Sequence, residues 1–217
     1  MEYPNFGKSI NSPKKLGRQA DLGLGGHLVL NFVNTCGGAG KERDADRWVD
    51  WRTALNWAGA NGLLSPSESR LVEKARLHAG LSESDVLKEL TELREAVHAV
   101  FSAIATGASC SEPDRMLLEN HIREALNHAN LCVAGREPAH WTVLPEKAGS
   151  ALIKDRLAVA ATELFMQPML SNVRECGACS WLFLDLSRSK SRRWCSMATC
   201  GNRVKAQRHY RAVRATG

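Results

Sequence analysis

Long apolar runs are missing from this 217-residue sequence. No segment reaches the roughly 18 consecutive apolar residues of a transmembrane helix, so we expect no membrane span. The first twenty residues are polar, and Lys8, Lys14, Lys15 and Arg18 occur there without the apolar stretch of a secretory signal. We therefore expect a cytoplasmic protein with no membrane partner, whose residues 1–20 are disordered or extended.

The signatures of common catalytic and nucleotide-binding sites are also missing. The glycine-rich segment 36–47 lacks the Gly-Lys-Ser/Thr ending of a phosphate-binding loop. No nucleophile elbow, Ser/His/Asp pattern or paired-carboxylate motif stands out. His121 and His128 are the best-placed histidine pair, but two helical turns separate them by about 10 Å along the axis. We therefore expect that the protein is not an enzyme.

The sequence does contain a compact set of four cysteines near its C-terminus. Cys176, Cys179, Cys195 and Cys200 follow the pattern C-x2-C-x15-C-x4-C. Four soft thiolates provide the tetrahedral shell that Zn²⁺ prefers. Because a shell made only of protein thiolates leaves no position for water or substrate, the predicted zinc site is structural.

Two other interpretations of the four cysteines are two disulfides and a chance cluster of buried thiols. The remaining cysteines, Cys36, Cys110 and Cys132, are scattered and odd in number, as is typical of reduced cytosolic thiols. Nothing in the sequence indicates an oxidising compartment, so zinc is the favoured interpretation.

The cysteine-rich segment is strongly basic. Residues 171–217 carry ten Lys and Arg, mostly Arg, against only Glu175 and Asp185, a side-chain balance of +8 in a chain whose total is +6. A basic module beside a near-neutral body is typical of a polyanion binder. Arginine also suits bidentate contacts with phosphates and bases. The simplest alternative is a solvated charged tail.

The order of residues in this segment predicts a zinc knuckle, a short hairpin and a helix, in the manner of a treble clef. Residues 181–185 alternate like a strand, residues 187–193 form a basic loop, and residues 204–211 favour a helix. Cys200 falls in or near the first turn of that helix, where the helix dipole favours a thiolate.

The candidate nucleic-acid contacts are the basic side chains of this loop and helix: Arg188, Lys190, Arg192, Arg193, Arg203, Lys205, Arg208 and Arg211. Trp181, Trp194 and Tyr210 are candidates for stacking on bases. For the two tryptophans, packing around the zinc is the better interpretation.

The region before the finger predicts a mostly helical body. Residues 27–33 are β-rich enough for a strand, and residues 131–134 and 140–144 favour a hairpin. Residues 168–175 are expected to link the body to the finger. Ser65 and Ser82 are predicted to cap helices. The helices are predicted over residues 48–62, 66–78, 83–104, 113–129 and 150–165.

Four polar residues of the body could line a small-molecule pocket. Asn31, Asn34 and Thr35 lie beside the apolar segment, and Arg94 would face inward from the long helix as an anion clamp. In the alternative interpretation, Asn34 and Thr35 end a strand and satisfy backbone groups in a turn, while Arg94 pairs with a nearby Glu.

Two segments resemble a known family. Residues 200–203, Cys-Gly-Asn-Arg, form the signature of the CGNR zinc finger, and residues 176–205 around them resemble the same family. Such proteins usually carry an N-terminal region called ABATE, described as a stress-induced transcription regulator of bacteria. Residues 31–35, Asn-Phe-Val-Asn-Thr, resemble its opening motif. The resemblance implies a bacterial origin, bound zinc and nucleic-acid binding.

We therefore expect an α+β fold that is mostly α. A helical ABATE-like domain with a few short antiparallel strands should cover residues 21–167, and a treble-clef-like, four-cysteine CGNR zinc finger residues 168–217. The favoured function is a DNA-binding transcriptional regulator whose body senses a small-molecule effector or forms a homodimer. The alternatives are an RNA-binding protein and an enzyme with its site in the helical body.

Overall fold

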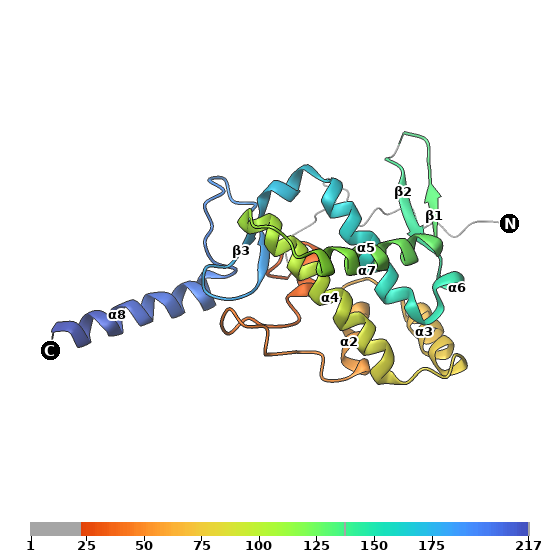
Figure 1. The fold of residues 1–217 in the computed structure, drawn as a ribbon, viewed down its shortest axis with the longest axis horizontal. Coiled ribbons are helices and arrows are strands. Elements are labelled where there is room, and N and C mark those ends of the chain that lie inside the picture. The colour runs from red at the N-terminus through yellow and green to blue at the C-terminus, as the bar shows by residue number, and fades with distance from the viewer. Residues whose placement is uncertain (1–22, 137, 217) are drawn as a thin grey trace.

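The computed structural model describes residues 23–136 and 138–216. As the sequence predicts, the chain is mostly helical with short antiparallel strands (Figure 1). The predictions for residues 1–20 lie outside the described residues. Within the described ranges, no helix is both long and apolar enough to cross a membrane.

Three helices form the centre of the body: α4 (Glu83–Thr106), α5 (Glu112–Asn127) and α7 (Leu152–Met166). They pack against one another, and α7 is buried along most of its length because it is apolar on nearly every side. Phe101 of α4 and Phe165 of α7 stack with their ring centroids 4.6 Å apart. The packing of α4, α5 and α7 forms the centre of the body's hydrophobic core.

The predicted helix starts at Ser65 and Ser82 are confirmed. Each serine accepts a hydrogen bond from the third backbone N–H of its helix, and Glu68 or Asp85 reciprocates, which completes a capping box at α3 (Pro66–His78) and at α4. The helix predicted over residues 48–62 is α2 (Trp51–Ala60). It starts later than predicted because Asp50 is its N-cap, with a 2.7 Å hydrogen bond from the backbone N–H of Thr53.

The strand predicted over residues 27–33 is wrong, because the structure has the helix α1 (Leu28–Val33) there. A short apolar run does not distinguish a buried strand from a buried helix. α1 packs against α7, α4 and β4. Its helical geometry also places Asn31 and Asn34, three residues apart, on one side. The residues that α1 buries are Val29, Leu30, Phe32 and Val33.

The predicted hairpin is present after α5. Strands β1 (Ala129–Cys132) and β2 (His140–Val143) pair antiparallel, with Ala129 opposite Val143. The chain then passes through the short helix α6 (Pro145–Ala148) and a 3-10 turn, η1 (Gly149–Ala151), into α7.

The linker expected over residues 168–175 is instead ordered structure. It forms a 3-10 turn, η2 (Pro168–Asn172), and strand β3 (Val173–Glu175), which pairs antiparallel with β4 (Leu182–Leu184). Three residues of this hairpin, Val173, Leu182 and Leu184, belong to the main hydrophobic core. The hairpin of the finger is therefore part of the body's packing.

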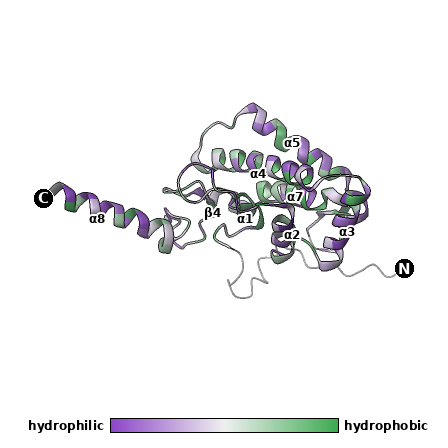
Figure 2. Cartoon of the chain, turned by 90° about the horizontal axis from the view of Figure 1, so that it is seen from below, coloured by the Kyte–Doolittle hydropathy of each residue, from purple (hydrophilic) through white to green (hydrophobic). Residues whose placement is uncertain are grey.

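The C-terminal part of the finger leaves the body. A π-helical turn, η3 (Met197–Gly201), leads into α8 (Asn202–Thr216), which packs mainly on η3. Both views show α8 extending away from the rest of the molecule (Figures 1 and 2).

Candidate metal centre and nucleic-acid interface

The four cysteines of the finger form one buried cluster. The Sγ atoms of Cys176, Cys179, Cys195 and Cys200 all lie within 4.8 Å of one another. The Cys179–Cys195 and Cys195–Cys200 sulfur pairs are 3.7 and 3.6 Å apart, far longer than a disulfide bond of about 2.05 Å. A tetrahedral zinc site with Zn–S bonds of about 2.3 Å requires sulfurs about 3.8 Å apart. The cluster therefore fits zinc, and a disulfide interpretation does not.

The close approach of the thiols shifts their pKa values in opposite directions. Hydrogen bonds from the thiols of Cys179 and Cys195 lower the pKa of Cys176. The same arrangement raises the pKa of Cys179 to about 12 and also raises the pKa of Cys195. A bound divalent ion lets all four cysteines ionise and ties the segment together.

Two glycines allow the chain to close around the sulfurs. A Cβ atom on Gly177 would lie 2.9 Å from the Trp194 ring, which covers the knuckle, and the Gly177 N–H donates to the Arg193 carbonyl at 2.9 Å. A Cβ atom on Gly201 would lie 2.3 Å from Sδ of Met197. A larger residue after Cys200 would therefore displace the Met197 side chain from its place over the η3 turn.

Arg203, predicted as a nucleic-acid contact, lies against the metal cluster. Its Nη2 donates to Sγ of Cys200 and to the carbonyl of Ala178, both at 3.2 Å. A hydrogen bond from a guanidinium stabilises a thiolate ligand, and the second bond ties α8 to the knuckle. The structure thus gives the arginine of the Cys-Gly-Asn-Arg motif a supporting role at the zinc site.

Arg192 also has a supporting position. Its guanidinium lies 4.4 Å from the centre of the Phe183 ring and donates to the carbonyls of Trp194, at 2.8 Å, and Cys195. These contacts hold the segment that returns to the zinc cluster at Cys195 in place.

The other six predicted contact residues are exposed. No Asp or Glu follows Asp185 in the sequence, so no carboxylate lies among them in the chain. They lie on the basic loop (residues 186–193) and on α8. We refer to them together as the basic surface: Arg188, Lys190, Arg193, Lys205, Arg208 and Arg211.

Asp185 anchors the basic loop. Its carboxylate accepts hydrogen bonds from the N–H and hydroxyl of Ser187, at 3.0 and 2.6 Å, and from the N–H of Arg192 at 2.9 Å. Burial alone would raise the pKa of Asp185, but these hydrogen bonds outweigh it and lower the pKa. The loop is thus closed at its base while its basic side chains remain in solvent.

Asn34 joins the body to the finger. Its side-chain Nδ2 donates to the Leu182 carbonyl at 2.8 Å, and its Oδ1 accepts from the Leu182 N–H at 2.9 Å. The amide thereby pairs with the backbone of β4 as a neighbouring strand would. Trp181 adds a second link, because its indole N–H donates to the Cys36 carbonyl at 3.1 Å.

Arg94 does not lie in a pocket with the other predicted pocket residues. Its guanidinium donates to both carboxylate oxygens of Asp46, at 2.9 and 2.6 Å, to Glu95 at 2.9 Å and to Thr35 Oγ1 at 3.2 Å. Pairing with a nearby Glu, the alternative interpretation, is what the structure has. Burial opposes the charge of Asp46, but the Arg94 contacts lower its pKa overall.

Asn31, Asn34 and Thr35 do line a hollow of about 280 Å³ at the junction between body and finger. Sequence reasoning missed Arg47 and the three tryptophans that complete its wall, since nothing in the spacing of Trp48, Trp57 and Trp181 indicates that they meet.

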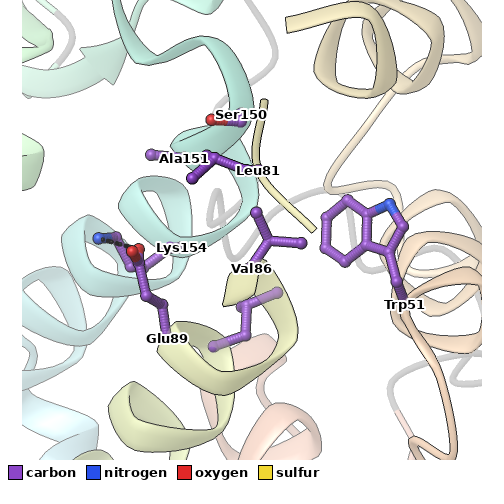
Figure 3. Close-up of a pocket in the computed structure, with 8 residues that line it drawn as sticks. Trp51, Leu81, Val86, Glu89, Ser150, Ala151 and Lys154 are labelled. Atoms are coloured by element: carbon purple, nitrogen blue, oxygen red, sulfur yellow. Dashed lines mark hydrogen bonds and ion pairs between the residues drawn. The ribbon is translucent and has the colours of Figure 1, made fainter. Parts of the chain in front are cut away.

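A smaller hollow of about 180 Å³ opens between α4 and α7 (Figure 3). Its Lys154 is held by Glu89 at 2.8 Å and Glu124 at 3.3 Å, as in a structural ion-pair network.

A buried four-cysteine zinc cluster in a hairpin-and-helix setting, attached to a helical body, defines a zinc-finger protein. Residues 172–212 match the CGNR zinc finger family. Residues 26–168 match the ABATE family, whose description is "Putative stress-induced transcription regulator". Since that match covers more than half of the chain, the protein belongs to the ABATE family. Neither is a family of enzymes, and no curated protein matches the chain.

Replacing one zinc ligand should remove the metal. We expect Cys179→Ser to lose zinc and to unfold the knuckle, with a lower melting temperature for the whole chain because Leu182 and Leu184 belong to the body's core. Metal analysis by mass spectrometry and thermal melting measure the two effects. Cys110→Ser, outside the cluster, serves as the control. Full zinc content in Cys179→Ser would falsify the ligand assignment.

Arg203→Ala should weaken zinc retention without removing a ligand. Loss of a group that supports a metal ligand typically lowers metal affinity about 10- to 100-fold. Competition against a chromophoric chelator measures this change. Arg208→Ala on the same helix has no contact with the sulfurs and should retain zinc like the wild type. Equal zinc transfer from both variants would contradict the supporting role of Arg203.

Asn34→Ala should destabilise the junction between body and finger. It leaves a buried N–H and a buried carbonyl of Leu182 without their partner, at a cost of about 3 kcal/mol in the free energy of unfolding. Urea denaturation of the zinc-loaded protein measures this cost. Asn56→Ala, an exposed asparagine on α2, should change stability by less than about 0.5 kcal/mol. A similarly small effect at Asn34 would rule out the amide as a link.

Proposed function

We propose that this protein is a zinc-dependent DNA-binding transcriptional regulator of the bacterial cytoplasm, and that it has no catalytic role. The observation that carries the proposal is the basic surface, which is free of carboxylates and fixed to the zinc cluster at the end of the molecule. Phosphate contacts from such a surface supply most of the affinity of a DNA-binding protein. The body would act as an effector-binding or dimerisation domain.

The shape of α8 favours duplex DNA. Its 15 residues span about 22 Å and residues 205–214 are exposed along its length, so the helix is free to enter a major groove about 12 Å wide. Figure 2 shows that hydrophilic residues make up much of this projecting helix. Lys205, Arg208 and Arg211 would then face the phosphates and base edges.

The positions of the aromatic residues favour DNA over single-stranded RNA. Single-strand binders use exposed aromatic rings as stacking platforms. Here Trp181 is bonded to the Cys36 carbonyl and covered by Arg47, with the guanidinium 4.4 Å from the ring centre, and Trp194 covers the zinc knuckle. Tyr210 is exposed but has Arg214 5.1 Å above its ring. RNA binding is therefore the second candidate.

A selection from a random duplex DNA pool, with excess single-stranded RNA as competitor, tests the proposal. We expect an enriched DNA motif, palindromic if two copies bind together. If the protein is retained on the RNA and no DNA motif is enriched, the protein is an RNA-binding protein and the DNA-binding proposal is wrong. Retention on neither would mean that the basic surface is a solvated face.

Arg208→Ala combined with Arg211→Ala should weaken DNA binding at every sequence. Two lost phosphate contacts flatten the dependence of log affinity on log salt by about two. Titrations at several salt concentrations measure this slope. The matched control is Arg52→Ala with Lys74→Ala, which removes the same charge from exposed positions on the body. Equal slopes in both double variants would mean that α8 does not contact DNA.

A further inference from the structure

The hollow at the junction between body and finger has the composition of a ligand site. It is bounded by residues of α1, α2 and the loop before α2, and by Trp181 next to β4. Its volume of about 280 Å³ lies at the small end of the range for ligand sites, so an occupant would have one or two fused rings. Its lining includes Asn31, Arg47, Trp48, Trp57, Asn61 and Trp181.

Three tryptophans give the hollow aromatic walls. Trp48 and Trp57 meet edge to face with their ring centroids 5.5 Å apart. Trp181 is held in place from two sides, because a Cβ atom on Gly38 would lie 2.8 Å from its ring and Arg47 lies over it. Fixed aromatic walls favour a planar aromatic ligand, since stacked or edge-to-face rings gain free energy beyond simple burial.

One indole N–H of the wall has no hydrogen-bond partner within the described residues. Trp48 is 4 % exposed, and its buried indole Nε1 has no hydrogen-bond partner among the described residues. Such an unpaired donor is uncommon in a buried position. The amide side chains of Asn31 and Asn61 are further polar groups of the wall.

The charge of the hollow is positive. Arg47 lines it, and among the residues that the structure describes no Asp or Glu lines it. One nitrogen of Arg47 donates to the Asn34 carbonyl at 2.7 Å, which positions the guanidinium beside the tryptophans. Within residues 23–136 and 138–216, Arg47 forms no ion pair, so its charge is available to an anion.

From these observations we propose that the hollow binds a small planar aromatic carboxylate. The ligand's ring lies against Trp48 and Trp57 and contacts Trp181 beside the guanidinium of Arg47, and the carboxylate accepts hydrogen bonds from Arg47. Binding involves no covalent step. Because the occupant contacts α2 of the body and Trp181 of the finger together, it stabilises the docking of the finger. A regulatory role for this stabilisation of the finger rests on the proposed function. The ligand site itself does not.

Calorimetric titration of the zinc-loaded full chain with 2-naphthoate tests the site, and the neutral 2-naphthamide is the matched probe. We expect saturable binding of 2-naphthoate and at least tenfold weaker binding of the amide. Arg47→Met should weaken naphthoate binding at least tenfold, whereas Arg52→Met, an exposed arginine outside the hollow, should not. No binding at millimolar naphthoate, or equal binding by both arginine variants, would overturn the proposal.

The chain's six tryptophans provide a second readout in the unmodified protein. In a ¹⁵N-edited spectrum, naphthoate should shift the indole N–H signals of the three lining tryptophans. The signals of Trp51, Trp141 and Trp194, which lie outside the hollow, should stay in place. Uniform or absent shifts would refute the site. Both measurements are made without nucleic acid, so a failure of DNA binding would not be mistaken for a failure of the ligand site.

Discussion

The four zinc–thiolate bonds are the constraint on which the finger depends. Apart from the cysteines, Phe183 is the only fully buried side chain of the finger's own cluster, with Ala178, Trp181 and Trp194 packed around it within the described part of the chain. So small an apolar cluster cannot offset the conformational entropy of the knuckle, the basic loop and η3. The metal therefore supplies the stability that a larger core would otherwise provide.

Strand β4 connects this metal cluster to the body because its two faces are buried against different partners. Leu182 and Leu184 point into the main core, whereas Phe183, between them, points into the cysteine cluster. The alternation is the ordinary period of two of a strand, applied here to two cores. The Asn34 amide then pairs with the backbone of Leu182. A change on either side of β4 therefore alters the packing on the other.

Much of this architecture could be predicted from local sequence signals. The spacing of the cysteines, the capping boxes at Ser65 and Ser82 and the hairpin after α5 each depend on residues close together in the chain. The helix α1 could not be predicted, since its apolar run suits either conformation. The supporting roles of Asn34, Arg192 and Arg203 depend on where side chains point in the folded state. Residue type and charge gave no indication of them.

The arginines of the finger fall into two groups: some form hydrogen bonds within the finger, and others are exposed to solvent. Only the exposed group is fully available to bind a polyanion. Arg192 and Arg203 both donate to backbone carbonyls, and Arg203 also donates to a ligand sulfur, so part of their hydrogen-bonding capacity is used within the finger. The six side chains of the basic surface remain, together with Arg214, which is also exposed on α8, and seven phosphate contacts would give a salt slope of at most about −6 for each finger. On the proposed function, two copies on a palindromic site would double the contacts, which gives the helical body a reason to dimerise.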